Sequence, residues 1–215
     1  MARNKYPEVT VERILDVSQR LFLEKGYEHT TIQDIVDGLG GLTKGAVYHH
    51  FKSKEEILDA VSDRMFLANN PFEAVKGRSD LNGLQKLREA IRINQSDSAR
   101  TSMTAQSVPL TYSPRVLMGM VDSNLRILTP YYLKLIEEGN RDGAIHTEYA
   151  REIAELLPLL TSLWILPSVF PATKAEMRRK FSFLGVMLEK MGLPLFDESI
   201  QKVVDEFFDQ LPDTK

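Results

Sequence analysis

Apolar residues recur every three or four positions through residues 8–66, and short polar breaks divide this stretch into four helices. The first helix is predicted between Thr10, a typical N-cap residue, and Gly26, because glycine commonly follows the last helical turn. The fourth is predicted to begin at a capping box of Ser53 and Glu56. The apolar residues of the first helix share one face: Val11, Ile14, Leu15, Leu21 and Phe22.

A second helix and a very short third helix are predicted on either side of a glycine turn. Thr31 is expected to cap the second helix, with Asp34 three residues later completing a box-like start. Gly40 and Gly41 end that helix, because consecutive glycines break a helical pattern. The third helix then runs from Lys44 to about His50.

The third helix has the features of a DNA-recognition helix. Thr43 is its predicted N-cap, and Val47 and Phe51 are expected to point inward. The small residues Gly45 and Ala46 allow the backbone to approach a groove closely, and helix N-termini favour phosphate. A helix, a tight turn and a second short helix together form the helix-turn-helix pattern.

The segment "GYEHTTIQDIVDGLGGLTKGAVYHHFKSKEEIL", residues 26–58, resembles the DNA-binding region of the tetracycline-repressor (TetR) family. The resemblance covers about the first 65 residues and implies an all-α protein with two domains. Residues 1–66 would form the three-helix helix-turn-helix DNA-binding domain, and residues 67–215 a larger helical domain for effector binding and dimerisation. The turn has one residue more than is usual in the family, at Gly41, which affects the tilt of the third helix.

The resemblance also implies which side chains face DNA. Lys44 would contact a base, while Thr31 and Lys54 would contact the phosphate backbone. Tyr48 would contact phosphate or the edge of a thymine, whereas His50 would pack inward. The DNA-binding residues implied in this way are Thr31, Thr43, Lys44, Gly45, Ala46, Tyr48, His49, Lys52 and Lys54.

The remainder of the chain predicts further helices with proline interruptions. Residues 67–83 are rich in helix breakers and predict a passage between domains. A loop is expected at residues 101–114, followed by a long helix in which Pro130 should cause a kink or a split. Pro158 should kink a further helix at residues 147–166.

Kinked helices pack unevenly, which favours a cavity between them. We expect such a cavity to bind a small-molecule effector through a largely apolar wall. Ordinary core packing remains the alternative for most of the aromatic and methionine side chains in this region. The predicted effector-binding residues are Trp164, Met120, Tyr131 and Tyr132.

The last two helices carry more apolar surface than one core needs. In residues 174–191 one apolar face is accompanied by a second, formed by Phe183, Val186 and Met187. Because a second apolar face needs a partner, we predict a four-helix bundle between two subunits. A larger core within one chain is the alternative. The predicted dimer-interface residues are Met177, Phe181, Leu184, Leu188, Val203 and Phe207.

Composition and motifs exclude several kinds of site. The chain has 215 residues and no cysteine, which excludes disulfides, thiolate metal ligands and cysteine nucleophiles. His49 and His50 are adjacent, so they point about 100° apart on a helix and make a poor metal site. Neither a nucleotide-binding glycine motif nor the spacing of a catalytic triad occurs. We therefore expect no enzymatic activity, no metal and no cofactor.

The chain is weakly acidic overall but contains a locally basic segment. The net charge is −3, from 27 Lys and Arg against 30 Asp and Glu, yet residues 38–54 contain lysines and histidines without any acid. Arg3 and Lys5 add basic groups near the N-terminus, and a local basic face can contact phosphates. Residues 156–173 carry no charge, but prolines interrupt them, so we expect a buried helix in a soluble cytoplasmic protein.

These features predict a DNA-binding transcriptional regulator. We expect a repressor that binds a pseudo-palindromic operator in double-stranded DNA as a homodimer, and that a small-molecule effector releases it. A second hypothesis stays open, in which the protein is a helical protein-interaction adaptor that reuses a helix-turn-helix fold without sequence-specific DNA binding. Salt-sensitive binding to random duplex DNA separates the two hypotheses.

Overall fold

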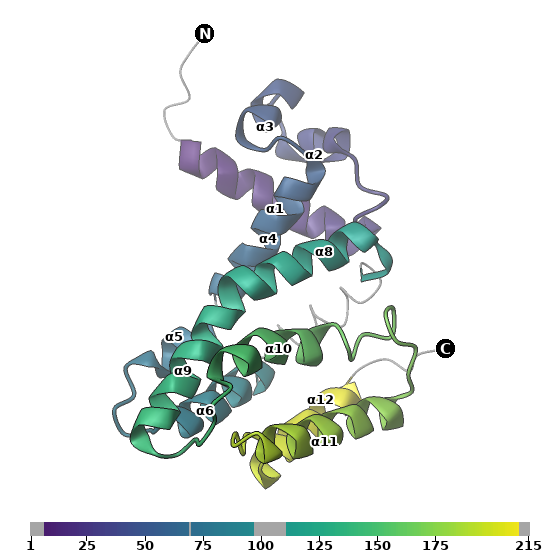
Figure 1. Ribbon diagram of the computed structural model, residues 1–215. Coiled ribbons are helices and arrows are strands. Elements are labelled where there is room, and N and C mark those ends of the chain that lie inside the picture. Colours follow the sequence, from purple (N-terminus) through teal and green to yellow (C-terminus); the bar gives the residue numbers. More distant parts are fainter. Residues whose placement is uncertain (1–6, 69, 97–110, 211–215) are drawn as a thin grey trace. The chain divides into compact units, whose positions relative to one another are not determined.

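The computed structural model describes residues 7–68, 70–96 and 111–210, and every regular element in these ranges is helical (Figure 1). This confirms the predicted all-α fold. The described part divides into two compact units, of which the first contains the four N-terminal helices and residues 113–119. These four helices are α1 (Pro7–Lys25), α2 (Ile32–Leu39), α3 (Lys44–His50) and α4 (Lys54–Ala68).

The second unit contains the remaining helices, although the first residues of α8 belong to the first unit. Its elements are α5 (Pro71–Lys76), α6 (Gly83–Ser96), α8 (Pro114–Ser123), the π-helix η2 (Asn124–Leu128), α9 (Thr129–Asp142), α10 (Ala150–Ser162), α11 (Lys174–Lys190) and α12 (Glu198–Gln210). None of the helices in the described ranges is long and apolar enough to cross a membrane. Arg3, Lys5 and most of the loop predicted at residues 101–114 lie outside the described residues.

The core of the first unit is built from the predicted apolar faces. α1 begins at Pro7, earlier than the predicted cap at Thr10, because proline is tolerated in a first turn whose N–H groups have no helical partner. α4 is tied to α1 by Arg64, whose guanidinium lies 3.0 Å from Glu12 and 2.7 Å from Asp16. The buried apolar side chains of these helices are Ile14, Leu15, Leu21, Phe22, Ile35, Leu39, Val47, Ile57, Leu58 and Val61.

The connection between α2 and α3 depends on left-handed backbone. Gly40 has a φ of 55° and Gly41 a φ of 106°, a region that side chains with a Cβ rarely adopt. The guanidinium of Arg13 on α1 donates a hydrogen bond of 2.7 Å to the carbonyl of Leu39, at the last turn of α2. The end of α2 is therefore held from α1 before the chain turns into α3.

Prolines mark two helix boundaries, of which the sequence predicted one. Residues 67–83 were expected to be a passage between domains, and within them Asn70 caps the short helix α5 and Pro71 occupies its first turn. Asparagine followed by proline is a helix-start signal as well as a turn signal, since proline at the first position loses no hydrogen bond. Pro130 interrupts its helix as expected, and the chain forms η2 just before it, where the Thr129 N–H bonds the Asn124 carbonyl.

The second unit brings α6 and α9 together at two glycines. A Cβ added to Gly83 would lie 2.2 Å from the backbone nitrogen of Gly139, so only glycine permits this approach. Nearby, the buried ammonium of Lys86 forms an ion pair of 2.5 Å with Glu138. The close packing of the two glycines and the ion pair between Lys86 and Glu138 therefore hold α6 against α9.

This close approach predicts a position-dependent cost of adding one methyl group. Gly83→Ala should destabilise the fold by about 1–3 kcal/mol, because the backbones of α6 and α9 must separate. Gly77→Ala is the matched control, since nothing lies within 4 Å of its added Cβ and its φ of −88° suits alanine. Urea unfolding followed by circular dichroism measures both, and equal stabilities for the two variants would contradict the packing argument.

Candidate nucleic-acid interface

α3 is a short helix held by one cap and by burial of its inner side. Thr43 has an extended backbone and its side-chain oxygen accepts a hydrogen bond of 3.2 Å from the Ala46 N–H. Val47 is fully buried and Phe51 is 7% exposed, as the sequence predicts. Because the Thr43 oxygen accepts within the helix, a phosphate contact by this residue would use its hydroxyl hydrogen.

The outer side of α3 gathers the side chains that the resemblance assigns to DNA. Thr43, Lys44 and Gly45 are exposed at its first turn, and His49 is exposed near its end. Tyr48 is 45% exposed and is therefore available for contact with a partner. The two remaining members of the predicted set near α3 are Ala46, which is half-buried, and Lys52, which is exposed just after the helix. His50, which was expected to pack inward, is half-buried against the ring of His49.

Thr31 forms the predicted capping box at the start of α2. Its backbone N–H and its hydroxyl both donate to Asp34 Oδ2, at 2.8 and 2.7 Å, and its oxygen accepts from the Asp34 N–H at 3.1 Å. Lys25 donates to Asp34 Oδ1 at 2.8 Å. The ion pair with Lys25 and the bonds from Thr31 hold the pKa of Asp34 well below its ordinary value. The Thr31 hydroxyl is thus engaged within the helix start.

Lys54 lies differently from the phosphate contact that was expected of it. Its ammonium donates hydrogen bonds to the carbonyls of Tyr27, at 2.7 Å, and Thr30, at 2.9 Å. It also lies 4.1 Å from the centroid of the Tyr27 ring. Two donors of its ammonium are therefore directed to carbonyls of the protein's own chain, whereas the resemblance assigns Lys54 to the DNA backbone. Sequence alone does not indicate these contacts, since the partners are 24 and 27 residues away.

Comparison with known proteins agrees with the geometry of the first unit. Residues 14–61 match the model of bacterial regulatory proteins of the tetR family. The transcriptional repressor KstR2 of Mycobacterium tuberculosis is 46% identical over 46 residues, which are 21% of this chain and 22% of the relative. KstR2 of Mycolicibacterium smegmatis is 24% identical over 152 residues, covering 64% of this chain and 68% of the relative. The chain spans about a fifth of the length of the first of these relatives.

Solved structures extend the likeness to the whole fold. A regulator of the tetR family from Shewanella sp. PV-4 covers 95% of this chain and 98% of its own, with a TM-score of 0.55 and 14% identity. A transcriptional regulator from Cytophaga hutchinsonii covers 94% of each chain, with a TM-score of 0.54 and 16% identity. Residues 14–61 therefore form a DNA-binding domain of the tetR family. Nothing in these comparisons supports the adaptor hypothesis.

The residues predicted to bind an effector fall into separate groups in the structure. Tyr131 and Tyr132 both pack on Phe72, with ring centroids 5.1 Å apart in each pair, and burial raises the pKa of Tyr132 to about 12. Trp164 instead packs edge-on against Phe183, at 5.9 Å. Met120, at the part of α8 that belongs to the second unit, is half-buried. The structure therefore brings the two tyrosines together but places Trp164 in a different aromatic pair.

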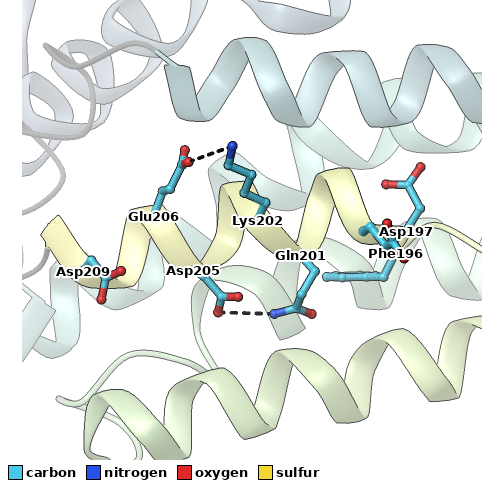
Figure 2. Close-up of a pocket in the computed structure, with 8 residues that line it drawn as sticks. Phe196, Asp197, Gln201, Lys202, Asp205, Glu206 and Asp209 are labelled. Atoms are coloured by element: carbon cyan, nitrogen blue, oxygen red, sulfur yellow. Dashed lines mark hydrogen bonds and ion pairs between the residues drawn. The ribbon is translucent and has the colours of Figure 1, made fainter.

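A groove that the sequence did not predict runs along α12 (Figure 2). In Figure 2 its polar side chains project from α12, with Lys202 directed toward Glu206 and Gln201 toward Asp205. Arginines of the same chain pair with three of its carboxylates: Arg178 with Asp205, at 3.3 Å, and with Asp209, and Arg88 with Asp197, at 3.0 Å. We therefore interpret the groove as surface shaped by ion pairs within the protein. Its lining residues are Phe196, Asp197, Glu198, Gln201, Lys202, Asp205, Glu206 and Asp209.

Four of the predicted dimer-interface residues are in the protein's own core, which corrects that prediction. α11 and α12 lie side by side in Figure 1, and the inner side of α11 packs on Ile200, Val204 and Phe208 of α12. A side chain buried in its own chain offers no surface to a second subunit. The four buried residues are Met177, Phe181, Leu184 and Leu188, whereas Val203 and Phe207 of α12 are half-buried.

The other face of α11 is the exposed one. Phe183 is 59% exposed and Val186 is 53% exposed. Trp164 lies against Phe183, and Phe170, near it in the chain, is also exposed. The sequence identified two apolar faces on this helix correctly, but periodicity does not tell which of them meets the protein's own core.

The capping box at α2 predicts a pH-dependent contribution to stability. Because the pKa of Asp34 is lowered on folding, its carboxylate stabilises the fold above the unfolded-state pKa of about 4. Asp34→Asn should therefore be less stable than the natural protein at pH 7, and the difference should shrink as the pH falls below about 4. Thermal unfolding between pH 7 and pH 3 measures the difference.

Asp37→Asn is the control for this experiment. Its side chain accepts a hydrogen bond of 2.8 Å from Gln33, which an amide oxygen can also accept, instead of forming an ion pair with Lys25. The difference between Asp37→Asn and the natural protein should change little over the same pH range. A pH-independent deficit in Asp34→Asn would contradict the role assigned to its charge.

Proposed function

We propose that the protein is a transcriptional repressor that binds a pseudo-palindromic operator in double-stranded DNA as a homodimer. The observation that carries this proposal is the outward side of α3, where Thr43, Lys44, Tyr48 and His49 are exposed while Val47 anchors the helix. We assign DNA binding to residues 1–66. Effector binding and dimerisation belong, in this proposal, to residues 67–215.

The dimensions and charge of α3 suit the major groove. An α-helix with its side chains is about 10–12 Å in diameter, and the major groove is about 12 Å wide, so α3 can enter it. Lys44 at the first turn can donate to guanine O6 and N7, which is a common base-specific contact of lysine. Lys52 is exposed just beyond the helix and can meet a phosphate.

A homodimer follows from the length of one recognition helix and from the exposed face of α11. One such helix contacts only a half-site, so a two-fold dimer supplies the second half. Phe183 and Val186 form the apolar centre of the interface that we propose, and the half-buried Val203 and Phe207 of α12 are further candidates for it. This interface replaces the buried residues that the sequence had indicated.

Regulation by a small molecule is part of the same proposal. An effector that binds residues 67–215 in one state of the dimer shifts the population toward the state that does not fit the operator. Tyr131 and Tyr132 remain candidates for the binding region, and Trp164 is a candidate at a different place. Members of the TetR family are generally not enzymes, and a repressor of this kind acts where the chromosome lies, in the cytoplasm.

The DNA-binding function is tested by selecting ligands from a library of random duplexes. The natural protein should enrich an inverted repeat and bind it less tightly as salt rises. Lys44→Ala should relax the preference at one symmetric base position, at a cost of about 1–3 kcal/mol in binding free energy. Lys190→Ala on α11 is the control and should leave the enriched sequence unchanged. Binding to neither random nor enriched DNA would support the adaptor hypothesis instead.

The proposed dimer surface is tested by placing a charge on it. Phe183→Glu should shift sedimentation from dimer to monomer at micromolar concentration, because a carboxylate cannot be buried unpaired at an apolar interface. Ser182→Glu adds the same charge to the neighbouring exposed position, and it should remain dimeric. If Phe183→Glu sediments as a dimer, this face of α11 is not the interface.

A further inference from the structure

Lys54 is the first residue of α4, a position that does not suit its charge. The N-terminus of a helix carries a partial positive charge, so a cation there is disfavoured unless other groups compensate it. Two carbonyl oxygens do so, those of Tyr27 at 2.7 Å and Thr30 at 2.9 Å. The face of the Tyr27 ring, with its centroid 4.1 Å from Nζ, adds a cation–π contact. The ammonium is thus surrounded by acceptors from its own chain.

The two carbonyls belong to the connection between α1 and α2. Thr30 is fully buried, and its hydroxyl lies 2.8 Å from the Gly26 carbonyl and 3.3 Å from the Leu21 carbonyl. Its own N–H donates to the Tyr27 carbonyl at 3.2 Å. The next residue is Thr31, the N-cap of α2. Lys54 therefore joins the start of α4 to the segment that sets where α2 begins.

The aromatic partner of Lys54 is itself held in place. Tyr27 is 2% exposed and packs edge-on against Phe22, with ring centroids 5.4 Å apart. Burial of its hydroxyl, together with the neighbouring carboxylate of Glu55, raises the pKa of Tyr27. Glu55 in turn pairs with Arg115 at 3.3 Å. A ring fixed on these sides gives the ammonium a defined position, unlike a lysine that extends into solvent.

We propose that Lys54 is a positioning residue for the DNA interface and not a phosphate ligand. It fixes the start of α2, and through α2 the turn that directs α3. This inference rests on the proposed DNA-binding function. A lysine that contacts phosphate contributes to affinity for every sequence and releases a counterion, whereas a positioning lysine affects mainly the sequence for which α3 must be correctly placed.

The neighbouring lysines allow a matched comparison. Lys54→Met and Lys52→Met each remove one ammonium and keep an unbranched side chain, and Lys52 is exposed. Binding is measured over a series of KCl concentrations to the duplex enriched by selection and to a scrambled duplex of equal length. For Lys52→Met, the slope of log K against log salt should fall by about one, and both duplexes should bind more weakly.

For Lys54→Met we expect the slope to stay at the natural value. Affinity for the enriched duplex should fall about tenfold or more, while affinity for the scrambled duplex changes little. A slope that falls by about one, with equal weakening for both duplexes, would show that Lys54 is a phosphate ligand and overturn the inference.

Lys54→Arg provides a second test that does not depend on tolerance of methionine. Arginine is at least as good a phosphate ligand as lysine, but its planar fork does not match a compact ammonium between two carbonyls and a ring. A positioning role therefore predicts weaker binding to the enriched duplex for Lys54→Arg. Unchanged affinity for this variant would overturn the inference.

Hydrogen exchange separates this inference from the proposed function. The amides at the start of α2, from Thr31 to Asp34, should exchange faster in Lys54→Met than in Lys52→Met, with or without DNA. If the natural protein binds no DNA but this difference in exchange occurs, the proposed function is wrong, while the inference that Lys54 fixes the start of α2 is supported. If exchange is equal in the two variants, the positioning role is wrong even when DNA binding is confirmed.

Discussion

A seven-residue helix is too short to be stable by itself, and the first unit is organised around this constraint. α3 has one side-chain cap, from Thr43, and one fully buried side chain, Val47. Its outward residues contribute nothing to a core. The position of α3 is therefore determined by the elements around it. Any movement of α2 or of the glycine turn would displace α3 and the surface that we assign to DNA.

The two ends of α2 show how this looseness is limited. At its C-terminal end Arg13 reaches from α1 to the carbonyl of Leu39 at 2.7 Å, which satisfies an acceptor that has no partner within the helix. Before its N-terminal end Lys54 reaches from α4 to the carbonyl of Thr30 at 2.9 Å. Long cationic side chains from two different helices thus hold one short helix at both ends, and Gly40 then sets the direction of the chain after it.

The sequence predicted features that depend on neighbours in the chain and missed those that depend on distant ones. The caps at Thr31 and Thr43 were predicted because a hydroxyl and the N–H three residues later are close in any helix start. The contacts of Lys54 were missed because they join residues from separate helices. Periodicity also found two apolar faces on α11, but it could not show that Leu184 faces α12 while Phe183 faces outward, since both choices bury an equally regular stripe.

Under the proposed function, the exposed aromatic side chains of α3 and α11 each have a partner that covers them. An exposed Tyr48 on α3 and an exposed Phe183 on α11 each cost solvation unless a partner covers them. A single short recognition helix contacts too few bases for a specific site, so its affinity depends on a second copy bound at a fixed spacing. An apolar face that joins two chains supplies that spacing without altering α3. Rigid placement of α3 and pairing through α11 are useful only together, because a fixed distance between two helices has no value if either helix can tilt.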